Sequence, residues 1–285
     1  MNAGGDASGK LLVVATPIGN LDDLTLRAID ALKTCDRVAA EDTRRTRQLL
    51  SHLGIGGKPV DALHAHSSDR DVARLVERLL AGETIALATD AGTPAVSDPG
   101  DALVKAAIAA GIVVVPIPGA SAVLAALVAS GLATGAGFRF VGFLPREGAA
   151  RRDAIALVCA TPEPTVLFES PERTEATLAE LADAMPERAA CVARELTKMH
   201  EEIVRGSLKD LATPREWRGE IAIVLGAWSP DARAEAVDDA AIDARIDREL
   251  EAGGHAKSVA DAIAAWSGRP RREIYERVVR RKNER

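Results

Sequence analysis

Repeated strand–loop–helix patterns in the first 130 residues constrain the fold more than any other feature of the sequence. Three apolar runs, at residues 11–15, 84–88 and 112–115, are each followed by a loop and then by a helical pattern. A shorter run at residues 37–40 precedes a fourth such loop and helix. Units of this kind predict a largely parallel sheet covered by helices. Ligands of such sheets bind beyond the carboxyl ends of the strands, so we expect all four loops to lie at that edge.

Residues 137–227 predict a second domain with a mixed sheet. Strand candidates outnumber helix candidates there, which favours antiparallel pairs beside parallel ones. The strands are expected at residues 139–144, 165–168, 189–193, 201–206 and 220–225, and the helices at residues 149–159 and 173–184. The fold class is therefore α/β with two domains. We expect a loose tail at residues 1–10, the N-terminal α/β domain at 11–134 and the mixed α/β domain at 135–228.

Residues 229–285 predict a small all-α extension. Residues 231–267 carry nine acidic and four basic side chains, whereas residues 268–285 carry eight basic and three acidic ones. Three short helices, near residues 240–251, 258–266 and 270–282, fit a helix-turn-helix module with a basic last helix. Two interpretations stay open: this helix contacts nucleic acid, or its apolar side packs and its charges face solvent.

Composition argues against several classes of protein. A net charge of −6 and an aromatic fraction of 3% mean that any RNA contact needs a local basic patch. Cys35, Cys159 and Cys191 form neither a zinc-ribbon spacing nor a disulfide framework, which favours the cytoplasm, as does the lack of a secretion signal. Residues 106–138 are uncharged, but Gly and Pro interrupt them, so we expect globular core and no membrane span.

The loops carry the residues suited to ligand binding. The sequence has no dinucleotide fingerprint, phosphate loop or nucleophile elbow. Instead, Gly and Pro in residues 90–100 let backbone groups approach a ligand closely, while Thr93 and Ser97 add hydroxyls. Residues 118–121 precede a helix whose free N–H groups favour a polar or anionic ligand group. One such loop alone is typical of an ordinary turn, but several on one sheet edge indicate a site.

Five motifs, in this order and spacing, carry a resemblance to a known family. They are Thr16-Pro17-Ile18-Gly19-Asn20-Leu21, Glu41-Asp42-Thr43-Arg44, the run 90–100, Pro118-Gly119-Ala120-Ser121-Ala122 and Arg194-Glu195-Leu196-Thr197-Lys198. Over about residues 11–227 the chain resembles the ribosomal small-subunit methyltransferase I family. These are class III, tetrapyrrole methylase-like enzymes that methylate the 2′-hydroxyl of a cytidine in 16S rRNA. The C-terminal tail resembles that family's helix-turn-helix extension.

The resemblance implies a cofactor, a substrate and a set of site residues. It implies a homodimer that holds S-adenosylmethionine between its two α/β domains and acts on 16S rRNA of the small ribosomal subunit. By motif position, the residues that bind the cofactor would be Pro17, Ile18, Gly92, Thr93, Val96, Ser121, Ala122, Ser170 and Ala222. The chain departs from the family at His64-Ala65-His66-Ser67, where His-Glu-His-Asn is more usual. This departure weakens the expectation that the segment helps to hold RNA.

Methyl transfer to a ribose hydroxyl would be helped by a group that accepts the hydroxyl proton. The sequence does not single out this catalytic residue, and the candidates are Glu41, Asp42, Asp98, Glu195 and His200. The carboxylates have structural alternatives, since Glu41 and Asp42 could cap a helix, Asp98 could form a turn and Glu195 could pair with Arg194.

Clusters of arginine suggest where RNA would bind. Arg44, Arg45 and Arg47 lie at the start of a predicted helix, where the helix dipole disfavours cations. They predict contact with RNA phosphates, against the alternative of a solvated face. A second and weaker candidate patch consists of Arg146, Arg151 and Arg152.

His64 and His66 would point the same way on a strand, but no third ligand lies nearby in the sequence, so we expect no metal site.

Two other functions stay open. A methyltransferase of the same fold that acts on a small tetrapyrrole would share the cofactor loops but would need neither the basic tail nor residues 41–47. A non-enzymatic RNA-binding or assembly protein would act through the tail. The net negative charge and the elaborate loops of the first domain count against that second alternative.

Overall fold

The computed structural model of the chain describes residues 9–64, 67–96, 100–228, 239–251 and 254–283. Its contacts divide the chain into two compact units. The first unit consists of Met1–Ala126 and Glu195–Glu202, and the second of Leu127–Arg194 and Ile203–Arg285. The segment Glu195–Glu202 thus packs with the first unit, although the residues on either side of it in the chain belong to the second.

A parallel sheet of five strands forms the centre of the first unit. In chain order the strands are β1 (Lys10–Val14), β2 (Arg37–Ala40), β3 (Val60–Ala62), β4 (Ile85–Ala88) and β5 (Val113–Ile117). They lie in the order β3-β2-β4-β1-β5, and all their pairings are parallel. The parallel sheet predicted from the repeated units is confirmed. Because β1 lies between β4 and β5, the loops that follow these three strands leave the sheet at neighbouring positions.

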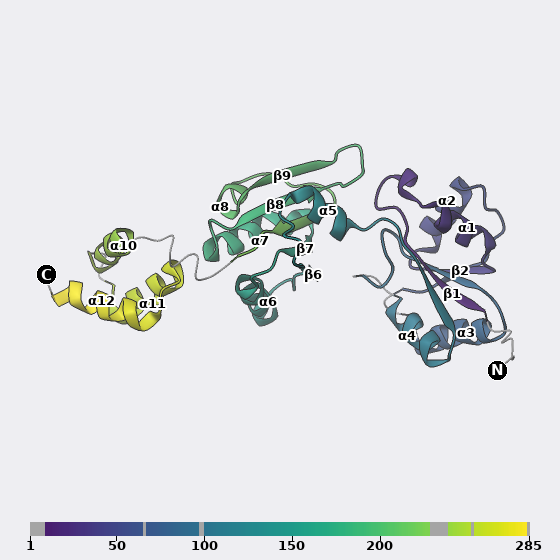
Figure 1. Ribbon diagram of the computed structural model, residues 1–285, viewed down its shortest axis with the longest axis horizontal. Coiled ribbons are helices and arrows are strands. Elements are labelled where there is room, and N and C mark those ends of the chain that lie inside the picture. The colour runs from purple at the N-terminus through teal and green to yellow at the C-terminus, as the bar shows by residue number, and fades with distance from the viewer. Residues whose placement is uncertain (1–8, 65–66, 97–99, 229–238, 252–253, 284–285) are drawn as a thin grey trace. The chain divides into compact units, whose positions relative to one another are not determined.

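Helices cover both faces of this sheet (Figure 1). They are α1 (Leu26–Thr34) and α2 (Thr43–His52) on one face, and α3 (Asp69–Leu80) and α4 (Asp101–Ala109) on the other, with the short helix η1 (Leu21–Asp23) before α1. Along β4, Ile85 and Leu87 join the apolar cluster beneath α3 and α4, whereas Ala86 and Ala88 join the cluster beneath α1 and α2. This two-residue period is that of a strand buried on both faces.

Strand β3 and helix α3 were not expected from the sequence. Helix α3 begins with a capping box in which Ser68 and Asp71 bond reciprocally, and Leu75 and Leu79 bury its apolar side. Both signals are local and could have revealed the helix. Strand β3 ends at Ala62, so His64 follows the strand rather than lying on it. His66 lies outside the described residues.

The uncharged stretch 106–138 is divided among the end of α4, strand β5 and helix α5 (Ala122–Ser130). Among the described residues, no helix has the length and apolar character needed to cross a membrane.

The second unit contains a mixed sheet, as predicted. Its strands are β6 (Arg139–Phe143), β7 (Thr165–Glu169), β8 (Ala189–Arg194), β9 (Glu202–Ser207) and β10 (Ile221–Leu225). They lie in the order β6-β7-β10-β8-β9. Strands β6 and β7 are parallel, whereas β10 pairs antiparallel with both of its neighbours.

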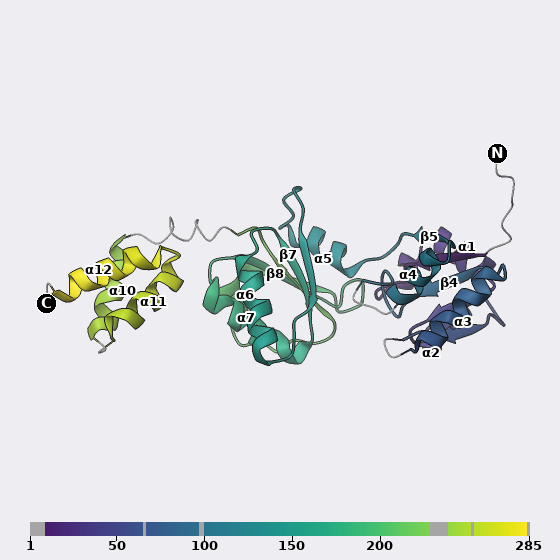
Figure 2. The same ribbon diagram turned by 90° about the horizontal axis from the view of Figure 1, so that it is seen from below.

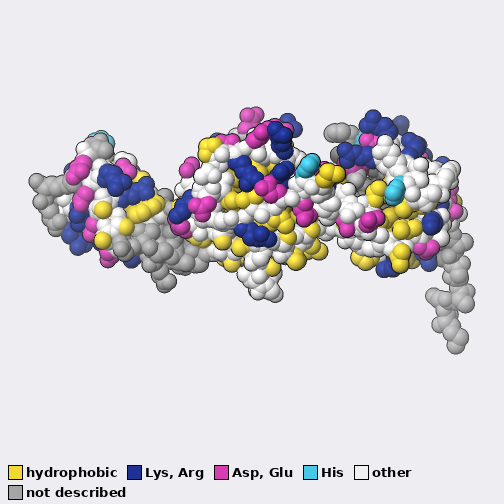
Figure 3. Space-filling view, turned by 90° about the horizontal axis from the view of Figure 1, so that it is seen from above, with side chains coloured by type: hydrophobic (Ala, Val, Ile, Leu, Met, Phe, Trp, Pro, Cys, Tyr) yellow, Lys and Arg dark blue, Asp and Glu magenta, His cyan; other side chains and the backbone are white. Residues whose placement is uncertain are grey.

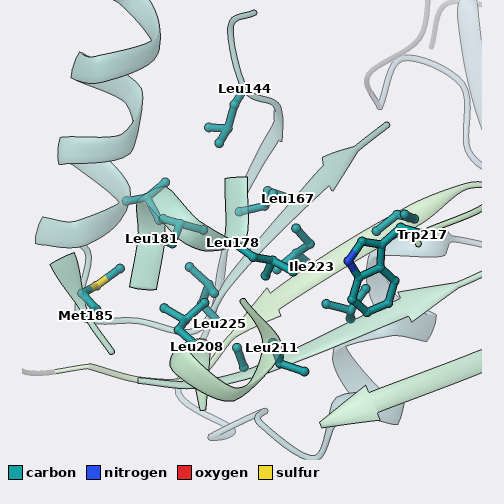
Figure 4. Packing of buried hydrophobic residues seen from close by; sticks show 14 residues of the cluster. Leu144, Leu167, Leu178, Leu181, Met185, Leu208, Leu211, Trp217, Ile223 and Leu225 are labelled. Atoms are coloured by element: carbon teal, nitrogen blue, oxygen red, sulfur yellow. The ribbon is translucent and has the colours of Figure 1, made fainter. Parts of the chain in front are cut away.

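Helices α6 (Gly148–Ala160) and α7 (Pro171–Ala184) lie side by side against this sheet (Figure 2), and the short helix α8 (Leu208–Leu211) follows β9. The apolar side chains of α7 and β10 meet in the core, where Leu178, Leu181, Ile223 and Leu225 are all fully buried (Figure 4). Trp217 closes one side of the cluster and is only 6% exposed. Apolar burial of this kind is the main stabilisation of the unit.

The three helices expected in the C-terminal extension are present: α10 (Asp239–Glu251), α11 (Ala256–Ser267) and α12 (Arg271–Asn283). They share a small apolar core that includes Ile242, Ile246, Ile263, Ile274 and Val278. A glycine with positive φ, Gly268 at +72°, ends α11 and allows the chain to turn into α12.

Ion pairs inside this extension explain its uneven charge. Arg277 of α12 binds Asp239 and Asp243 of α10 at 2.8 and 2.6 Å, and Arg281 binds Asp243 at 3.2 Å and also Asp247. Basic and acidic side chains accordingly lie intermingled on these helices (Figure 3). The packing interpretation therefore accounts for these two arginines of the basic last helix.

Candidate functional site

Backbone hydrogen bonds join two loops at the carboxyl edge of the first sheet. Thr16, two residues after β1, donates its N–H to the carbonyl of Gly92 at 2.8 Å and accepts the N–H of Gly92 at 3.0 Å. The buried hydroxyl of Thr16 also donates to the carbonyl of Thr89 at 3.1 Å. The loop after β1 and the loop after β4 are therefore held together by an isolated antiparallel bridge.

The loop after β5 joins the same group. The hydroxyl of Thr93 donates to the carbonyl of Ala120 at 3.3 Å. A Cβ on Gly92 would lie 3.4 Å from Cγ2 of Ile18 and 3.8 Å from the oxygen of Ala120. A Cβ on Gly119 would lie only 3.0 Å from that of Ala15, so the loops approach too closely there for a larger side chain. Three of the sequence motifs thus meet at one edge of the first unit.

The predicted cofactor-binding residues of this unit differ in exposure. Pro17 and Ile18 are buried against the unit, Thr93, Ser121 and Ala122 are half-buried, and Val96 is 38% exposed. Ser121 and Ala122 stand at the start of α5. Ser97 and Asp98, which the sequence also singled out, lie outside the described residues.

Unusual backbone conformations concentrate in two of these segments. Among the described residues, the non-glycine residues with positive φ are Ala95 at +65°, Glu195 at +50° and Thr197 at +65°. A left-handed conformation is costly for residues other than glycine and is kept only where the surrounding contacts impose it. Such strain is found preferentially at ligand-binding and catalytic segments, which is consistent with a site built from these loops.

The segment Glu195–Glu202 packs against the loop after β1. Thr197 Oγ1 accepts the N–H of Asn20 at 3.0 Å, and a Cβ on Gly19 would lie 2.5 Å from Cγ of Lys198. The carboxylate of Glu195 forms an ion pair with Lys198 at 2.8 Å. The first and fifth sequence motifs are therefore neighbours, although they are 177 residues apart in the chain.

The arginines predicted to bind RNA lie on the first turns of α2. Arg44, Arg45 and Arg47 are exposed, with 85% of the Arg44 side chain and 63% of the Arg45 side chain open to solvent. Asp42 caps this helix by accepting the N–H of Arg44 at 2.7 Å and also binds its guanidinium. The hydrogen bonds from Arg44 lower the pKa of Asp42 to about 2. The structural alternative for Asp42, a helix cap, is thus what the structure shows.

Two further carboxylates connect α2 with the loop after β4. The carboxylate of Glu41 accepts the hydroxyl of Thr89 at 3.0 Å and the N–H of Asp90 at 3.5 Å. The carboxylate of Asp90 accepts the N–H of Asp42 at 3.0 Å and lies 3.5 Å from Nη1 of Arg45. Sequence reasoning did not predict this arrangement. The only signal was that each carboxylate lies within two residues of the end of an apolar strand, which places both at the same sheet edge once the strand order is known.

The second unit holds the other two predicted cofactor-binding residues. Ser170 occupies the N-cap of α7, yet its side chain does not cap the helix. Ala222 lies on the central strand β10, opposite Phe168 and Ala193, and is 4% exposed.

A buried carboxylate fixes the backbone at Ser170. Glu169 is 2% exposed, accepts the N–H of Ser170 at 2.9 Å and binds Arg173 and the hydroxyl of Thr177. Arg151, expected in an exposed basic patch, is instead only 8% exposed, and it binds Glu180 at 3.0 Å and Thr177 at 2.9 Å. The patch interpretation is wrong for Arg151, because α6 packs this side chain against α7.

Comparison with known proteins identifies the family to which the chain belongs. The family model of the tetrapyrrole (corrin/porphyrin) methylases matches residues 10–212. The chain belongs to the tetrapyrrole methylases. Within that family it is 44% identical to the "ribosomal RNA small subunit methyltransferase I" of Xylella fastidiosa, over 94% of this chain and 98% of the relative. It is 41% identical to the protein of the same name from Halalkalibacterium halodurans, over 95% of this chain and 94% of the relative.

Solved structures show the same methylase fold. A uroporphyrin-III C-methyltransferase from Thermus thermophilus, complexed with S-adenosyl homocysteine, has a TM-score of 0.55 and 22% sequence identity to the chain. The similarity covers 76% of this chain and 97% of that protein. At this identity the likeness supports the two-domain methylase architecture, which agrees with the fold class expected from the sequence.

Proposed function

We propose that this tetrapyrrole methylase transfers a methyl group from S-adenosylmethionine to the 2′-hydroxyl of a cytidine ribose in 16S rRNA of the small ribosomal subunit. The observation that carries the proposal is the extent of the similarity. The relatives named ribosomal RNA small subunit methyltransferase I match 94–95% of the chain at 41–44% identity. Their name gives the substrate class, and the five ordered sequence motifs point to the cytidine ribose.

The residues at the edge of the first sheet fit S-adenosylmethionine. Ile18 packs close to Gly92, since a Cβ on Gly92 would lie 3.4 Å from Cγ2 of Ile18, and Thr93 adds a hydroxyl. The first N–H groups of α5, at Ser121 and Ala122, favour a carboxylate such as that of the methionine part. A structure of the same fold is complexed with S-adenosyl homocysteine, which supports this choice of cofactor. We propose that the cofactor-binding residues are Pro17, Ile18, Gly92, Thr93, Val96, Ser121, Ala122, Ser170 and Ala222.

S-adenosylmethionine supplies an activated methyl group when bound, so the chain's own residues must mainly align the acceptor. Alignment of reacting groups can contribute about 7–11 kcal/mol in favourable cases. A residue of the chain must also accept the proton of the ribose hydroxyl. Asp42 is poorly suited to this task, since a carboxylate whose pKa is about 2 holds a proton weakly. Among the described candidates, Glu41 accepts hydrogen bonds from the hydroxyl of Thr89 and the N–H of Asp90 and so keeps a fixed position at this edge of the sheet.

The exposed arginines of α2 supply the local basic patch that an acidic RNA-binding chain needs. We propose that Arg44, Arg45 and Arg47 contact RNA phosphates. Because phosphate contacts are largely independent of sequence, their loss should weaken binding and reduce its dependence on salt. Arg44→Ala and Arg47→Ala are therefore expected to raise KM for the subunit with little change in kcat, and a lower kcat at unchanged KM would contradict this role.

A homodimer in the cytoplasm completes the proposal. Leu124 and Val128, one helical turn apart on α5, are 52% and 75% exposed, which is unusual for an apolar helix. We propose that a second copy of the chain covers them. Light scattering after size exclusion should then show a dimer, which Val128→Lys should weaken.

Labelled S-adenosylmethionine and 30S subunits from cells that lack the ribose methylation test the reaction. Digestion of the RNA and mass spectrometry should locate a single 2′-O-methylcytidine. No label on the subunits, despite measurable cofactor binding, would refute the RNA substrate and favour a small tetrapyrrole. Removal of residues 231–285 should weaken methylation of the subunit without abolishing cofactor binding. If the full chain binds RNA but no cofactor, and the deletion of residues 231–285 abolishes RNA binding, the chain is a non-enzymatic RNA-binding protein.

A further inference from the structure

Asp90 lies in the loop after β4, at the carboxyl edge of the first sheet. The proposed function assigns Arg45, which Asp90 faces, to RNA, and Gly92, in the same loop as Asp90, to the cofactor. Strands β2 and β4 are neighbours in which Ala40 lies opposite Ala88, so Glu41 and Thr89 leave the sheet together. The hydrogen bond from Thr89 to Glu41 then fixes the start of the loop after β4. Thr89 is 4% exposed, and its carbonyl also accepts the hydroxyl of Thr16, so this position is held from both sides.

Each oxygen of the Asp90 carboxylate faces a different group of α2. Oδ1 accepts the N–H of Asp42 at 3.0 Å, which anchors Asp90 to the helix start. Oδ2 lies 3.5 Å from Nη1 of Arg45, a loose ion pair whose arginine is 63% exposed. A phosphate that binds Arg45 can therefore draw its guanidinium away while the hydrogen bond to Asp42 keeps Asp90 in place.

Release of Arg45 changes the charge that Asp90 presents to the adjoining loop. The paired arginine screens part of the field of the carboxylate, and its departure strengthens the negative potential two residues before Gly92 and three before Thr93. S-adenosylmethionine has a positive sulfonium, whereas S-adenosylhomocysteine has a neutral sulfur at that place. A free Asp90 carboxylate thus favours the methyl donor over the product.

We infer that Asp90 is a positioning residue through which RNA binding at Arg45 raises the affinity of the site for a cationic cofactor. The inference rests on the proposed function, since it needs the phosphate at Arg45 and the cofactor beside Gly92. Coupling between two ligands is reciprocal, so the cationic cofactor raises the affinity for RNA by the same factor. Because an exposed ion pair contributes little, this factor is about two- to fivefold. Its effect is to recruit the methyl donor to the RNA-bound enzyme and to release the product.

Equilibrium binding of an unreactive cofactor analogue tests the inference. Sinefungin keeps a positive charge where S-adenosylmethionine has its sulfonium, and S-adenosylhomocysteine serves as the neutral comparison. Their dissociation constants are measured with the full chain alone and with saturating unmethylated 30S subunits. We expect subunits to tighten sinefungin about two- to fivefold and S-adenosylhomocysteine by less. Equal effects on both compounds, or no effect on sinefungin, would overturn the inference.

Two variants separate the mechanism from general damage to the fold, because tighter binding of sinefungin is expected in one of them and not in the other. Arg45→Ala permanently removes the ion-pair partner of Asp90, so sinefungin should bind the free chain about two- to fivefold more tightly and gain nothing further from subunits. Asp90→Asn keeps an acceptor for the N–H of Asp42 but removes the charge, so sinefungin should bind the free chain no more tightly than wild type and again gain nothing from subunits. Weaker binding in Arg45→Ala would contradict the mechanism.

A matched control comes from α3. Arg74 is 52% exposed and forms similarly loose ion pairs, at 3.7 Å with Asp71 and 4.0 Å with Asp61. Arg74→Ala should leave the affinity for sinefungin and its response to subunits as in wild type, and a response lost in this control as well would overturn a specific role for Arg45. The methylation assay on the same wild-type preparation separates the two proposals. Normal ribose methylation without coupling refutes the role of Asp90 alone, whereas no methylation and no subunit binding refutes the proposed function.

Discussion

Arg188 allows a strong prediction about the stability of the second unit. Its side chain is 1% exposed, and it donates to four backbone carbonyls rather than to a carboxylate. These carbonyls belong to Val158, Thr161, Glu163 and Gly226, at 2.9–3.3 Å. Burial lowers the pKa of Arg188 to about 10, so the guanidinium still carries its charge at neutral pH. One cation thus joins the end of α6, the loop before β7 and the end of β10.

Arg188→Met keeps most of the volume but removes the donors. The carbonyl of Val158 would keep the N–H of Thr161, and that of Glu163 would keep the hydroxyl of Thr165. The carbonyls of Thr161 and Gly226 would lose the one donor that the described residues give them. An orphaned buried acceptor costs about 1–3 kcal/mol, so two cost about 2–6 kcal/mol. Relief from burying a charge offsets part of this, which leaves a loss in the lower part of that range, about 2–4 kcal/mol.

Tryptophan fluorescence during urea unfolding measures this loss, because Trp217, Trp228 and Trp266 all belong to the second unit. A fall in Tm of roughly 4–16 °C should accompany it. The control is Arg205→Met, which removes an exposed arginine that also donates to carbonyls, those of Ala129 and Ser130 at the end of α5. Water can replace these bonds, so we expect a loss below about 1 kcal/mol. Equal losses in the two variants would refute the argument from burial.

Three further predictions concern the loops and the extension. Gly92→Ala places a side chain on a residue with φ +80°, which should lower the free energy of unfolding by about 1–2 kcal/mol. Calorimetry should also show weaker binding of S-adenosylhomocysteine, and an unchanged affinity would speak against a cofactor role for this loop. Gly19→Ala would place its Cβ 2.5 Å from Lys198, so limited proteolysis should cut segment 195–202 faster than in wild type, and an equal cutting rate would contradict the packing of that segment. The hydrogen bond from Arg277 lowers the pKa of Asp243, so its stabilisation is present above the unfolded pKa of about 3.9 and is lost as the pH falls through the lower folded value. Thermal scans from pH 6 to pH 2 should therefore show a smaller decline for Asp243→Asn than for wild type, and parallel declines would refute this contribution.

Much of the fold could be predicted because its signals are local. The parallel sheet followed from four apolar runs with loops after them, and the three C-terminal helices followed from apolar spacing and glycine turns. Strand β3 was missed because it has three residues, two of which are only partly buried, so it leaves no apolar run. The domain limits at residues 134 and 228 stay predictions, as do the roles of the individual cofactor-binding residues.

The identity of the site loops was also within reach of the sequence, whereas their contacts were not. Gly and Pro mark the loops, because these residues permit turns and close backbone approach wherever they occur. The bridge from Thr16 to Gly92 spans 76 residues, and no local pattern predicts which two loops a sheet will bring together. The strand order decided it, by placing β1 between β4 and β5.

The sequence by itself determined the layered architecture and the family, because hydrophobic periodicity and ordered motifs are properties of the chain. Only the tertiary structure decided which charged side chains are buried and which partners they contact. Arg151 became a buried ion-pair partner, Asp42 a helix cap, and Asp90 the carboxylate that faces Arg45. The physical reason is that the free energy of a charge depends on its solvation and on its nearest opposite charge, and both are set by segments that are distant in the chain.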